Sequence, residues 1–378
     1  MRRMLCLVLA VWVLAGSVGA VGPEVAGKGA LLMDAATGTI LFEQDAHASL
    51  APASVTKVMT LLLIMEAIDG GQIRWEDGVT ASETAAAKGG SQVYLKVGET
   101  MTVADMVKSI AVSSANDCAC AMAEHLAGSE AAFVERMNQR AAELGMADTH
   151  FVNCTGLDDD PSARNHKTSA HDIAVMSREL LVNHPDIKQY TTIWMDTIRD
   201  GAFGLSNTNK MVRYYPGCTG LKTGFTSSAG YCLSSAAERD GMELIAVVLG
   251  ADTSQNRFAA CKNMLDYGFS NYALYSPTMQ DGASVPVTLG RAEAVAVVPE
   301  TSPRLLVEKS KLNTLTAEVS LEPSADAPVA QGQKLGTLTV KAGEEVLAQI
   351  PLVAETAVAR LSWGDVMIRV LRQVAMAG

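Results

Sequence analysis

The pattern of apolar residues changes at Pro277, and this change limits the chain to a fold with at least two parts. Before Pro277, segments with the 3.6-residue spacing of helices alternate with short apolar runs. After it, short valine-rich segments alternate with Gly, Pro and Asp, as in strands joined by turns. The chain of 378 residues is long enough for both parts. We therefore predict a mixed domain over residues 25–275 and a small all-β domain over residues 278–356.

Strand patterns stand at both ends of the first domain. Gly29–Asp34 and Thr39–Glu43 flank a Gly-containing turn, which is typical of a hairpin. Leu221–Phe225 and Gly230–Ser235 form a second hairpin pattern, and Met242–Leu249 follows as a further strand. Early and late strands can share one antiparallel sheet that is packed by helices, so the pattern predicts an α+β fold.

The segment between the hairpins is mainly helical. Ser54–Ile68 is apolar nearly all round, which predicts a buried central helix. The chain from Thr102 to about Met146 also has helical spacing, with a capping-box-like start at its N-terminus. Shorter helices are expected over Ser169–Leu181 and Asn256–Tyr267.

The N-terminus has the pattern of a targeting segment. Arg2 and Arg3 precede the apolar run Met4–Ala15, and small residues follow up to Ala20. This order predicts a secretory signal over residues 1–20 and a mature protein that works outside the cytoplasmic membrane. An uncleaved anchor is the alternative, although the apolar run is short for a membrane span.

The C-terminal segment 362–377 has one apolar stripe at helical spacing. The stripe consists of Trp363, Val366, Met367, Val370, Leu371 and Val374. Arg360, Arg369 and Arg372 lie off it. Such an amphipathic helix can lie in an anionic membrane surface, and a helix docked on the β-rich domain is the alternative.

Composition excludes several classes of function. A net charge of −11 without a basic block argues against nucleic-acid binding, because phosphate contacts need clustered cations. No zinc-binding Cys or His pattern occurs, and Asp158–Asp160 lacks the Glu that closes an EF-hand loop, so no metal is expected. Loss of the signal removes Cys6, and the remaining six cysteines fit either bridges or buried free thiols.

Ser54 and Lys57 stand at the start of the predicted central helix, three residues apart and so on one face. A serine becomes a good nucleophile when a base takes its proton. A lysine can act as this base if burial and a nearby cation lower its pKa. The helix N-terminus also offers free backbone N–H groups to a developing oxyanion. An N-cap serine beside a solvated lysine would give the same spacing.

The triplet Ser114-Ala115-Asn116 follows an apolar helical segment. Its hydroxyl can relay a proton, and its amide can hold a substrate carbonyl. Ser and Asn are also ordinary turn residues, so the triplet alone indicates little.

The triplet Lys222-Thr223-Gly224 lies in a predicted strand. A strand edge can align an extended peptide through main-chain hydrogen bonds. Lys222 would bring positive charge to the site, Thr223 a hydroxyl, and Gly224 room for close backbone approach. An exposed edge lysine before a bulge is the alternative.

The order SxxK, SxN, KTG is the signature of the penicillin-interacting serine enzymes. The flanking residues are more specific: Ala51–Thr60, Gly90–Glu99 and Gly220–Thr226 resemble the low-molecular-mass penicillin-binding proteins that are D-alanyl-D-alanine carboxypeptidases. The resemblance extends over roughly residues 25–356. It implies a β-lactamase/transpeptidase-like domain, an antiparallel sheet with a helical cluster, followed by the small all-β domain.

The resemblance also implies roles for individual residues. Ser54 would form the acyl-enzyme and Lys57 would be the general base, assisted by Ser114 and Asn116. The strand with Lys222, Thr223 and Gly224 would hold the substrate's terminal carboxylate and backbone, and the N–H groups of Ser54 and Phe225 would form the oxyanion hole. The implied substrates are peptidoglycan stem peptides, the implied inhibitors are β-lactams, and no metal or organic cofactor is needed.

The sequence departs from the family pattern at two positions. The middle residue of SxN is often Gly and is Ala115 here, and the residue after KTG is often His and is Phe225 here. Phe225 keeps a backbone role but loses a side-chain contact to substrate. Arg257 matches a family position that meets the substrate carboxylate, and a helix-surface arginine is the alternative.

Three rival functions share these motifs. A class A β-lactamase needs a glutamate in the loop between SxN and KTG, and the candidate loop Gly156–His166 has aspartates but no Glu. A peptidoglycan DD-endopeptidase and a non-catalytic receptor for β-lactams or wall fragments are the others. His166 and His171 flank a helix cap, and we assign them structural rather than catalytic roles.

Overall fold

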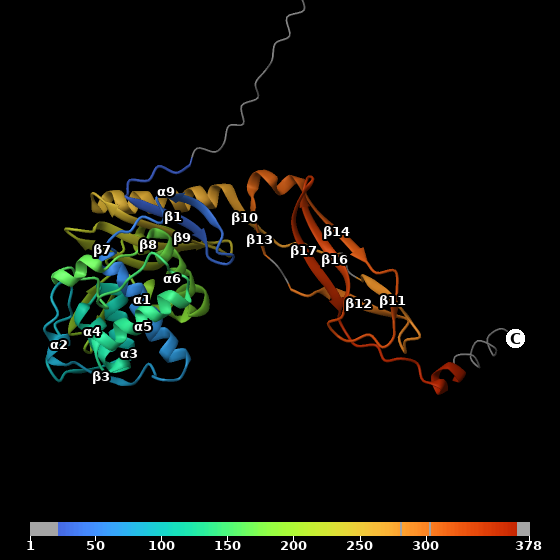
Figure 1. Ribbon diagram of the computed structural model, residues 1–378, viewed down its shortest axis with the longest axis horizontal. Coiled ribbons are helices and arrows are strands. Elements are labelled where there is room, and N and C mark those ends of the chain that lie inside the picture. The colour runs from blue at the N-terminus through green and yellow to red at the C-terminus, as the bar shows by residue number, and fades with distance from the viewer. Residues whose placement is uncertain (1–21, 280–281, 302–303, 369–378) are drawn as a thin grey trace, which may run out of the picture.

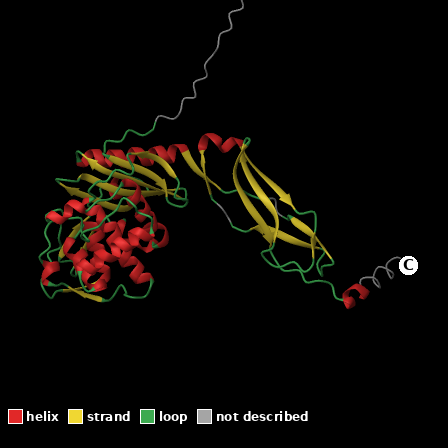
Figure 2. Ribbon diagram, in the orientation of Figure 1, coloured by secondary structure: helices red, strands yellow, loops and turns green. Residues whose placement is uncertain are grey.

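The structure is a computed structural model that describes residues 22–279, 282–301 and 304–368. The predicted signal segment and residues 369–378 of the predicted amphipathic helix lie outside the described residues. A mixed domain and a β-rich domain lie side by side (Figure 1), and most of the helices belong to the first (Figure 2). The predicted α+β architecture with a following all-β domain is confirmed.

One five-stranded sheet forms the centre of the first domain. Its strands are β1 (Gly29–Asp34), β2 (Ile40–Gln44), β7 (Cys218–Thr226), β8 (Gly230–Arg239) and β9 (Met242–Ala251). Their order is β2-β1-β9-β8-β7, and every neighbouring pair is antiparallel. The early hairpin and the late strands therefore share one sheet, as the sequence predicted.

The two faces of this sheet pack against different helices, because side chains alternate along a strand. On β1, Leu31 and Met33 belong to the core shared with the helical layer. Ala30 and Leu32 belong to the core shared with α9 (Ser254–Asn271), which covers the opposite face. This alternation makes the first domain a three-layer structure: one helix, the sheet, and a cluster of helices.

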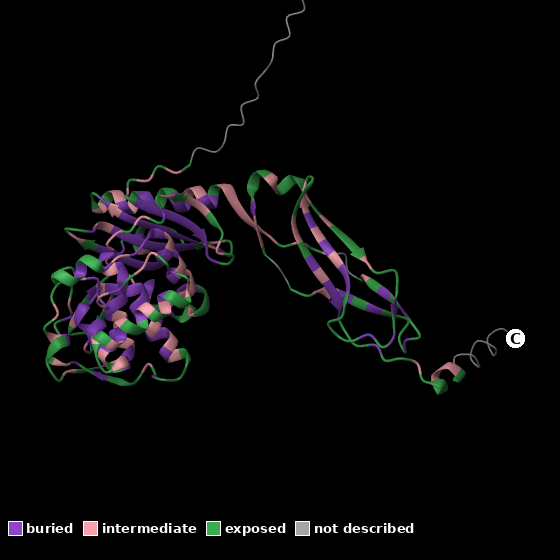
Figure 3. Ribbon diagram, in the orientation of Figure 1, coloured by how far each residue is buried: buried purple, intermediate pink, exposed green. Residues whose placement is uncertain are grey.

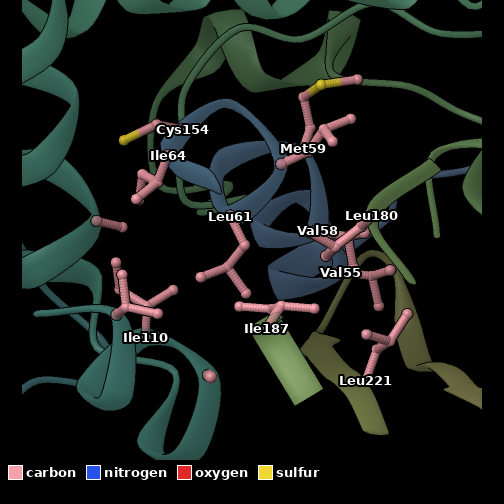
Figure 4. Packing of buried hydrophobic residues seen from close by; sticks show 14 of the residues in the cluster. Val55, Val58, Met59, Leu61, Ile64, Ile110, Cys154, Leu180, Ile187 and Leu221 are labelled. Carbon is pink, nitrogen blue, oxygen red and sulfur yellow. The ribbon is translucent and has the colours of Figure 1, made fainter. Parts of the chain in front are cut away.

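The helical layer surrounds α1 (Lys57–Asp69), which follows the short 3-10 helix η1 (Ala53–Thr56). Figure 4 shows side chains of α1 pointing to several sides toward neighbouring elements, as expected for a helix that is apolar nearly all round. The other helices are α2 (Glu83–Ala86), α3 (Val103–Ser113), α4 (Asn116–Ala127), α5 (Glu130–Glu143), η2 (Pro161–Asn165), α6 (Ala170–Asn183), η3 (Pro185–Ile187), α7 (Lys188–Thr191) and α8 (Met211–Tyr214).

Two small antiparallel two-stranded sheets accompany the helical layer, β3 (Gly78–Thr80) with β4 (Thr100–Thr102) and β5 (Met195–Ile198) with β6 (Phe203–Ser206). The predicted helical stretch from Thr102 is divided into three helices. The first break is at Ser114, whose φ of +63° ends α3 in the left-handed region. Ser114 and Ala115 therefore form the turn between α3 and α4, and Asn116 of the SxN triplet is the first residue of α4.

The second domain is built on a six-stranded sheet in the order β14-β16-β17-β12-β11-β15. Its strands are β11 (Ser284–Thr288), β12 (Ala294–Pro299), β14 (Leu315–Leu321), β15 (Ala325–Asp326), β16 (Lys334–Ala342) and β17 (Glu345–Ala354). Backbone pairing continues past β17, where Val358 bonds to Val329 and Arg360 pairs with Gly290.

The domains are joined by a two-stranded sheet between β10 (Tyr272–Tyr275) and β13 (Leu305–Glu308). The 3-10 helix η4 (Lys309–Thr314) follows, and its Lys309 donates a hydrogen bond to the carbonyl of Phe269 in α9. Each domain has its own buried core, visible as separate purple regions in Figure 3.

All six cysteines of the described residues are free thiols. Cys118, Cys120, Cys154, Cys232 and Cys261 are buried, and Cys218 is half-buried. Burial raises the pKa of Cys232 to about 11, which keeps this thiol protonated at neutral pH. Of the two possibilities left open by the sequence, the fold shows buried free thiols.

None of the described helices combines the length and the hydropathy that crossing a bilayer requires.

Candidate active site

Ser54 lies in a tight turn at the head of α1. The preceding residue, Ala53, has a φ of +48°, in the left-handed region that non-glycine residues rarely adopt. The N–H of Val55 closes the turn by donating to the carbonyl of Pro52 at 3.2 Å. A strained backbone turn thus presents the Ser54 hydroxyl at the N-terminal end of a helix, where backbone N–H groups stabilise negative charge.

Lys57 places a basic group within hydrogen-bond distance of this hydroxyl. Its Nζ lies 3.1 Å from Ser54 Oγ and donates a 2.8 Å hydrogen bond to the carbonyl of Thr155. The side chain is fully buried, and burial lowers the pKa of Lys57 to about 7. Near neutral pH a large fraction of Lys57 is a free amine that can accept the Ser54 proton.

Lys222 on β7 is the second buried amine. Burial lowers its pKa well below the ordinary lysine value, and the positive charges of Lys57 and Arg257 lower it further. Of the two causes expected from the sequence, burial and a nearby cation, burial is the one that lowers the pKa of Lys57. The Lys222 amine donates to the carbonyl of Thr223 at 2.9 Å.

The close approach of β7 to the serine turn depends on Gly224. A Cβ at this position would lie 2.7 Å from the carbonyl oxygen of Pro52 and 3.0 Å from the nitrogen of Ser54. Real Cβ atoms essentially never approach a backbone so closely, so any side chain would push β7 and the turn apart. The glycine of KTG therefore permits close approach between the backbone of the strand and that of the serine turn.

Asn116 opens α4 and holds a neighbouring loop. Its Nδ2 donates to the carbonyl of Gly89 at 2.7 Å, and its backbone N–H donates to the carbonyl of Ser91. Its Oδ1 is buried without a hydrogen-bond partner among the described residues. An unpaired buried acceptor is costly, so this atom is a position where a bound substrate can donate a hydrogen bond.

A short polar chain connects the KTG strand with the SxN turn. Thr223 Oγ1 donates to Thr208 Oγ1 at 2.7 Å, and the N–H of Thr208 donates to the carbonyl of Val112, two residues before Ser114. Ser114 itself is buried. The three motifs thus come from three separate regions of the chain: the KTG strand lies against the serine turn at Gly224 and is linked to the segment before the SxN turn through Thr208.

Arg257 is buried in the first turn of α9 rather than exposed on its surface. Its guanidinium donates to the carbonyl of Gly224 at 2.9 Å and stacks on Phe258, with 4.8 Å to the ring centroid. Arg257 therefore holds the KTG strand from α9. Phe225 is half exposed and packs on Tyr231 at 4.3 Å between ring centroids.

Sequence reasoning missed a loop that lies along α1. Lys57 bonds to the carbonyl of Thr155, and Thr60 Oγ1 donates to the carbonyl of Cys154 at 2.6 Å. Gly156 has a φ of +79°, and a Cβ there would lie 1.8 Å from the carbonyl oxygen of Ala53. This glycine within the candidate loop was the one signal that could have revealed the contact.

Two groups of acidic side chains in the described residues have the composition of possible metal ligands. Asp158–Asp160 is exposed, with Asp158 bonded to Ser228, in agreement with a solvated loop. Glu66, Glu179 and His184 lie within reach of one common ion, but both carboxylates already bind the guanidinium of Arg140. These contacts describe an ion-pair network.

Two family profiles match the chain. The profile of D-alanyl-D-alanine carboxypeptidases matches residues 17–253, and that of the penicillin-binding protein 5 C-terminal domain matches residues 275–360. The chain is 42% identical over 335 residues to the D-alanyl-D-alanine carboxypeptidase DacF of Bacillus subtilis, covering 87% of this chain and 85% of that protein. DacA of Escherichia coli is 31% identical over 347 residues, covering 88% and 83%.

Solved structures agree with these matches. Penicillin-binding protein 5 of Haemophilus influenzae superposes with a TM-score of 0.76 at 28% identity, covering 90% of this chain and all of that one. Penicillin-binding protein D2 of Listeria monocytogenes, solved in an ampicillin-bound form, covers 65% of this chain and 98% of its own, with a TM-score of 0.59 and 32% identity.

The fold and the order of the three motifs define a penicillin-interacting serine enzyme. Among these enzymes, the chain belongs to the D-alanyl-D-alanine carboxypeptidase family. It is a serine-type D-Ala-D-Ala carboxypeptidase, a hydrolase of peptidoglycan metabolism. It acts on peptidoglycan stem peptides, outside the cytoplasm.

Proposed function

We propose that Ser54 is the nucleophile and Lys57 the general base of the carboxypeptidase reaction. The observation that carries this proposal is the 3.1 Å contact between Lys57 Nζ and Ser54 Oγ, together with a Lys57 pKa of about 7. Lys57 takes the hydroxyl proton as Ser54 Oγ attacks the penultimate D-Ala carbonyl. The C–N bond breaks, D-Ala leaves with a proton, and water then hydrolyses the acyl-enzyme.

The remaining motif residues serve the same reaction. The backbone N–H groups of Ser54 and Phe225 stabilise the oxyanion, and Ser114 relays the proton toward the leaving amine. Asn116 and Thr223 hydrogen-bond the substrate, while Lys222 attracts its terminal carboxylate. Arg257 supports these contacts by holding the Gly224 carbonyl.

β-Lactams would acylate the same serine, because they present a reactive amide to the same nucleophile. The stretch from Gly156 to His166 contains no glutamate to activate a deacylating water. The penicilloyl enzyme should therefore persist for minutes or longer. Turnover of many penicillin molecules per second would instead favour a β-lactamase.

The decisive experiment uses the mature protein with a fluorescent penicillin and a diacyl-D-Ala-D-Ala tripeptide. The parent should gain one penicillin in mass and release D-Ala, and Ser54→Ala should do neither. Ser162→Ala removes an exposed serine of η2 and is the matched control, which should behave as the parent. A labelled Ser54→Ala protein contradicts the assignment.

We further propose that residues 1–20 are a cleaved secretion signal and that the C-terminal helix anchors the enzyme to a membrane surface. The support comes from the first described turn of that helix. The side chain of Trp363 is 90% exposed, and Met367 and Ile368 are also exposed rather than docked on the β-rich domain. Ser362 and Asp365 hydrogen-bond each other at the start of this turn.

A truncation tests the anchor. We proposed from the sequence that residues 278–356 form the β-rich domain, but Val358 is buried and pairs with Val329, so the cut belongs after Leu361. The full mature chain should float with vesicles of anionic lipid, and the truncated chain should not, while both release D-Ala. A full chain that stays entirely in solution contradicts the anchor and leaves the docked helix.

A further inference from the structure

The buried His166 uses both ring nitrogens on the far side of the serine turn. The N–H of Val152 donates to Nδ1 at 3.2 Å, and Nε2 lies 2.8 Å from the hydroxyl of Thr56. Because Nδ1 accepts, the proton of the neutral ring sits on Nε2 and is donated to Thr56 Oγ1. The ring packs edge-on against Phe151, which fixes its plane.

Thr56 connects His166 with Ala53, the left-handed residue before the nucleophile. Its hydroxyl donates to the carbonyl of Ala53 at 2.8 Å. This is the carbonyl that belongs to the left-handed Ala53 and precedes the N–H of Ser54 in the same peptide unit. Since a peptide unit is planar, fixing its carbonyl also fixes the direction of the Ser54 N–H.

Gly156 lets the loop backbone pack directly against Ala53 and Thr56. A Cβ on Gly156 would lie 2.7 Å from Thr56 Oγ1 and still closer to the carbonyl of Ala53. The adjacent Thr155 carbonyl accepts the Lys57 amine. The side chains of Thr56 and His166 thus hold the turn that carries the nucleophile, and the backbone of the loop holds its base.

We propose that His166 is a positioning residue for acylation: acting through Thr56, it orients the Ala53–Ser54 peptide that carries the nucleophile and one oxyanion N–H. This inference rests on the proposed role of Ser54. His166 does not act on the reacting atoms itself. It stabilises the strained left-handed conformation of Ala53, which would otherwise relax and misplace the Ser54 N–H.

The electrostatic surroundings keep His166 neutral, as the hydrogen-bond pattern requires. Burial lowers the pKa of His166 to about 4, and the charges of His150, Lys167 and Lys57 act in the same direction. A protonated ring would place an N–H against the N–H of Val152. The ring therefore stays a donor to Thr56 across the pH range in which Lys57 titrates.

Two substitutions of His166 test its two hydrogen bonds separately. His166→Gln can retain a donor near the Nε2 position for Thr56 but loses the acceptor for Val152. His166→Asn retains an acceptor near the Nδ1 position for Val152 but loses the donor to Thr56. Each variant loses one hydrogen bond and the packing on Phe151, so their unfolding midpoints should fall by similar amounts.

The acylation rate constant with fluorescent penicillin distinguishes positioning from simple structural support. His166→Asn should acylate on the order of 10- to 100-fold more slowly than His166→Gln, since small misplacements of reacting groups cost about this much. With the tripeptide substrate, the loss should appear in kcat and not in KM. Equal rates in the two variants overturn the proposal.

A double-mutant cycle tests the route through Thr56. Thr56→Val removes the hydroxyl while keeping the branched shape, and Thr56→Ser keeps the hydroxyl and should acylate nearly as the parent. In the Thr56→Val background, His166→Asn should cause no further loss of rate. Losses that multiply would show that His166 acts independently of Thr56 and would equally overturn the inference.

The same samples separate this inference from the proposed function. Peptide mapping of the labelled parent identifies the acylated serine. A label on another serine defeats the role of Ser54, whatever the His166 variants do. A label on Ser54 with indistinguishable Gln and Asn variants defeats only the role of His166.

Discussion

The two domains bury different kinds of residues. In the first domain the interior holds Lys57, Lys222, Arg257, Asp117 and His166 in addition to its apolar core. In residues 282–301 and 304–361 of the second domain, every buried residue is apolar or glycine. Burying a polar group costs free energy unless it is hydrogen-bonded, so a domain that only has to fold avoids it.

The comparison indicates where the chemistry lies without reference to any motif. The lowered pKa values of the buried Lys57 and Lys222, the unpaired Asn116 Oδ1 and the left-handed Ala53 and Ser114 lie in the first domain, within or next to the motifs. Such features are retained where function requires them. The second domain has a regular aliphatic core, which suits a rigid support.

The strongest test of this contrast replaces a buried amine with an apolar side chain of similar length. Lys57→Met should lower the acylation rate by at least about 10²–10⁴-fold, because the general base is gone. Its stability should fall by only about 1–3 kcal/mol, because the buried carbonyl of Thr155 loses its donor. Penicillin labelling and thermal unfolding measure the two effects, and a large loss of stability would make Lys57 a structural residue.

A smaller effect is expected from a single methyl group. Gly224→Ala places a Cβ against Pro52 and Ser54 and should slow acylation on the order of 100-fold. Two controls add the same methyl without a clash, Gly204→Ala in the first domain and Gly343→Ala in the second. Gly343 has a φ of +59°, so its variant should lose about 1 kcal/mol of stability and no activity. Normal acylation by Gly224→Ala would show that β7 and the serine turn can separate without cost.

The pH dependence follows from the Lys57 pKa of about 7. Only the neutral amine accepts the Ser54 proton, so acylation should be constant above pH 7. Below it, the rate should fall about tenfold for each pH unit as Lys57 becomes protonated. Acylation rates between pH 5 and 8 check this, and a flat profile would exclude Lys57 as the titrating base.

A core substitution in the second domain should separate stability from activity. Leu338 is fully buried on β16, so Leu338→Ala should destabilise that domain by about 2–5 kcal/mol. The acylation rate should be unchanged, since none of the proposed site residues lies there. A parallel fall in acylation would mean that the second domain also shapes the site.

The smallest expected effect concerns the exposed apolar residues near the C-terminus. Met367 is 66% exposed on the proposed anchor, and Met195 is 67% exposed on the first domain. Met367→Ser should weaken binding to anionic vesicles by a few-fold, and Met195→Ser should not change it. Vesicle sedimentation measures both, and equal behaviour would remove the support for the anchor.

The sheet and its helices could be predicted because their signals are local. Strand alternation around β1 and β9, the all-apolar α1 and the valine-rich strands after Pro277 appear directly in the sequence. The helical stretch predicted from Thr102 is broken at Ser114 in the structure. This break could not be predicted, because a non-glycine residue in the left-handed region has no reliable sequence signal. Its position within a motif explains why the strain is kept.

The parts of the site that could not be predicted come from contacts between distant segments. The carbonyl of Thr155 holds Lys57 across 98 positions, and His166 reaches Thr56 across 110. Backbone carbonyls have no sequence pattern, and a buried neutral histidine has the same letter as an exposed one. The position of Arg257 behind Gly224, rather than on a helix surface, likewise needed the packing of α9 on the sheet.

The described residues contain five buried free thiols and one half-buried thiol. Outside the cytoplasm, native packing protects these thiols from oxidation. Unfolding would expose these six thiols, and six thiols can close into 15 different sets of three bridges. In an oxidising medium, bridge formation can trap molecules that have unfolded before they refold. The working lifetime of the enzyme would then be set by its rate of unfolding and not by its equilibrium stability.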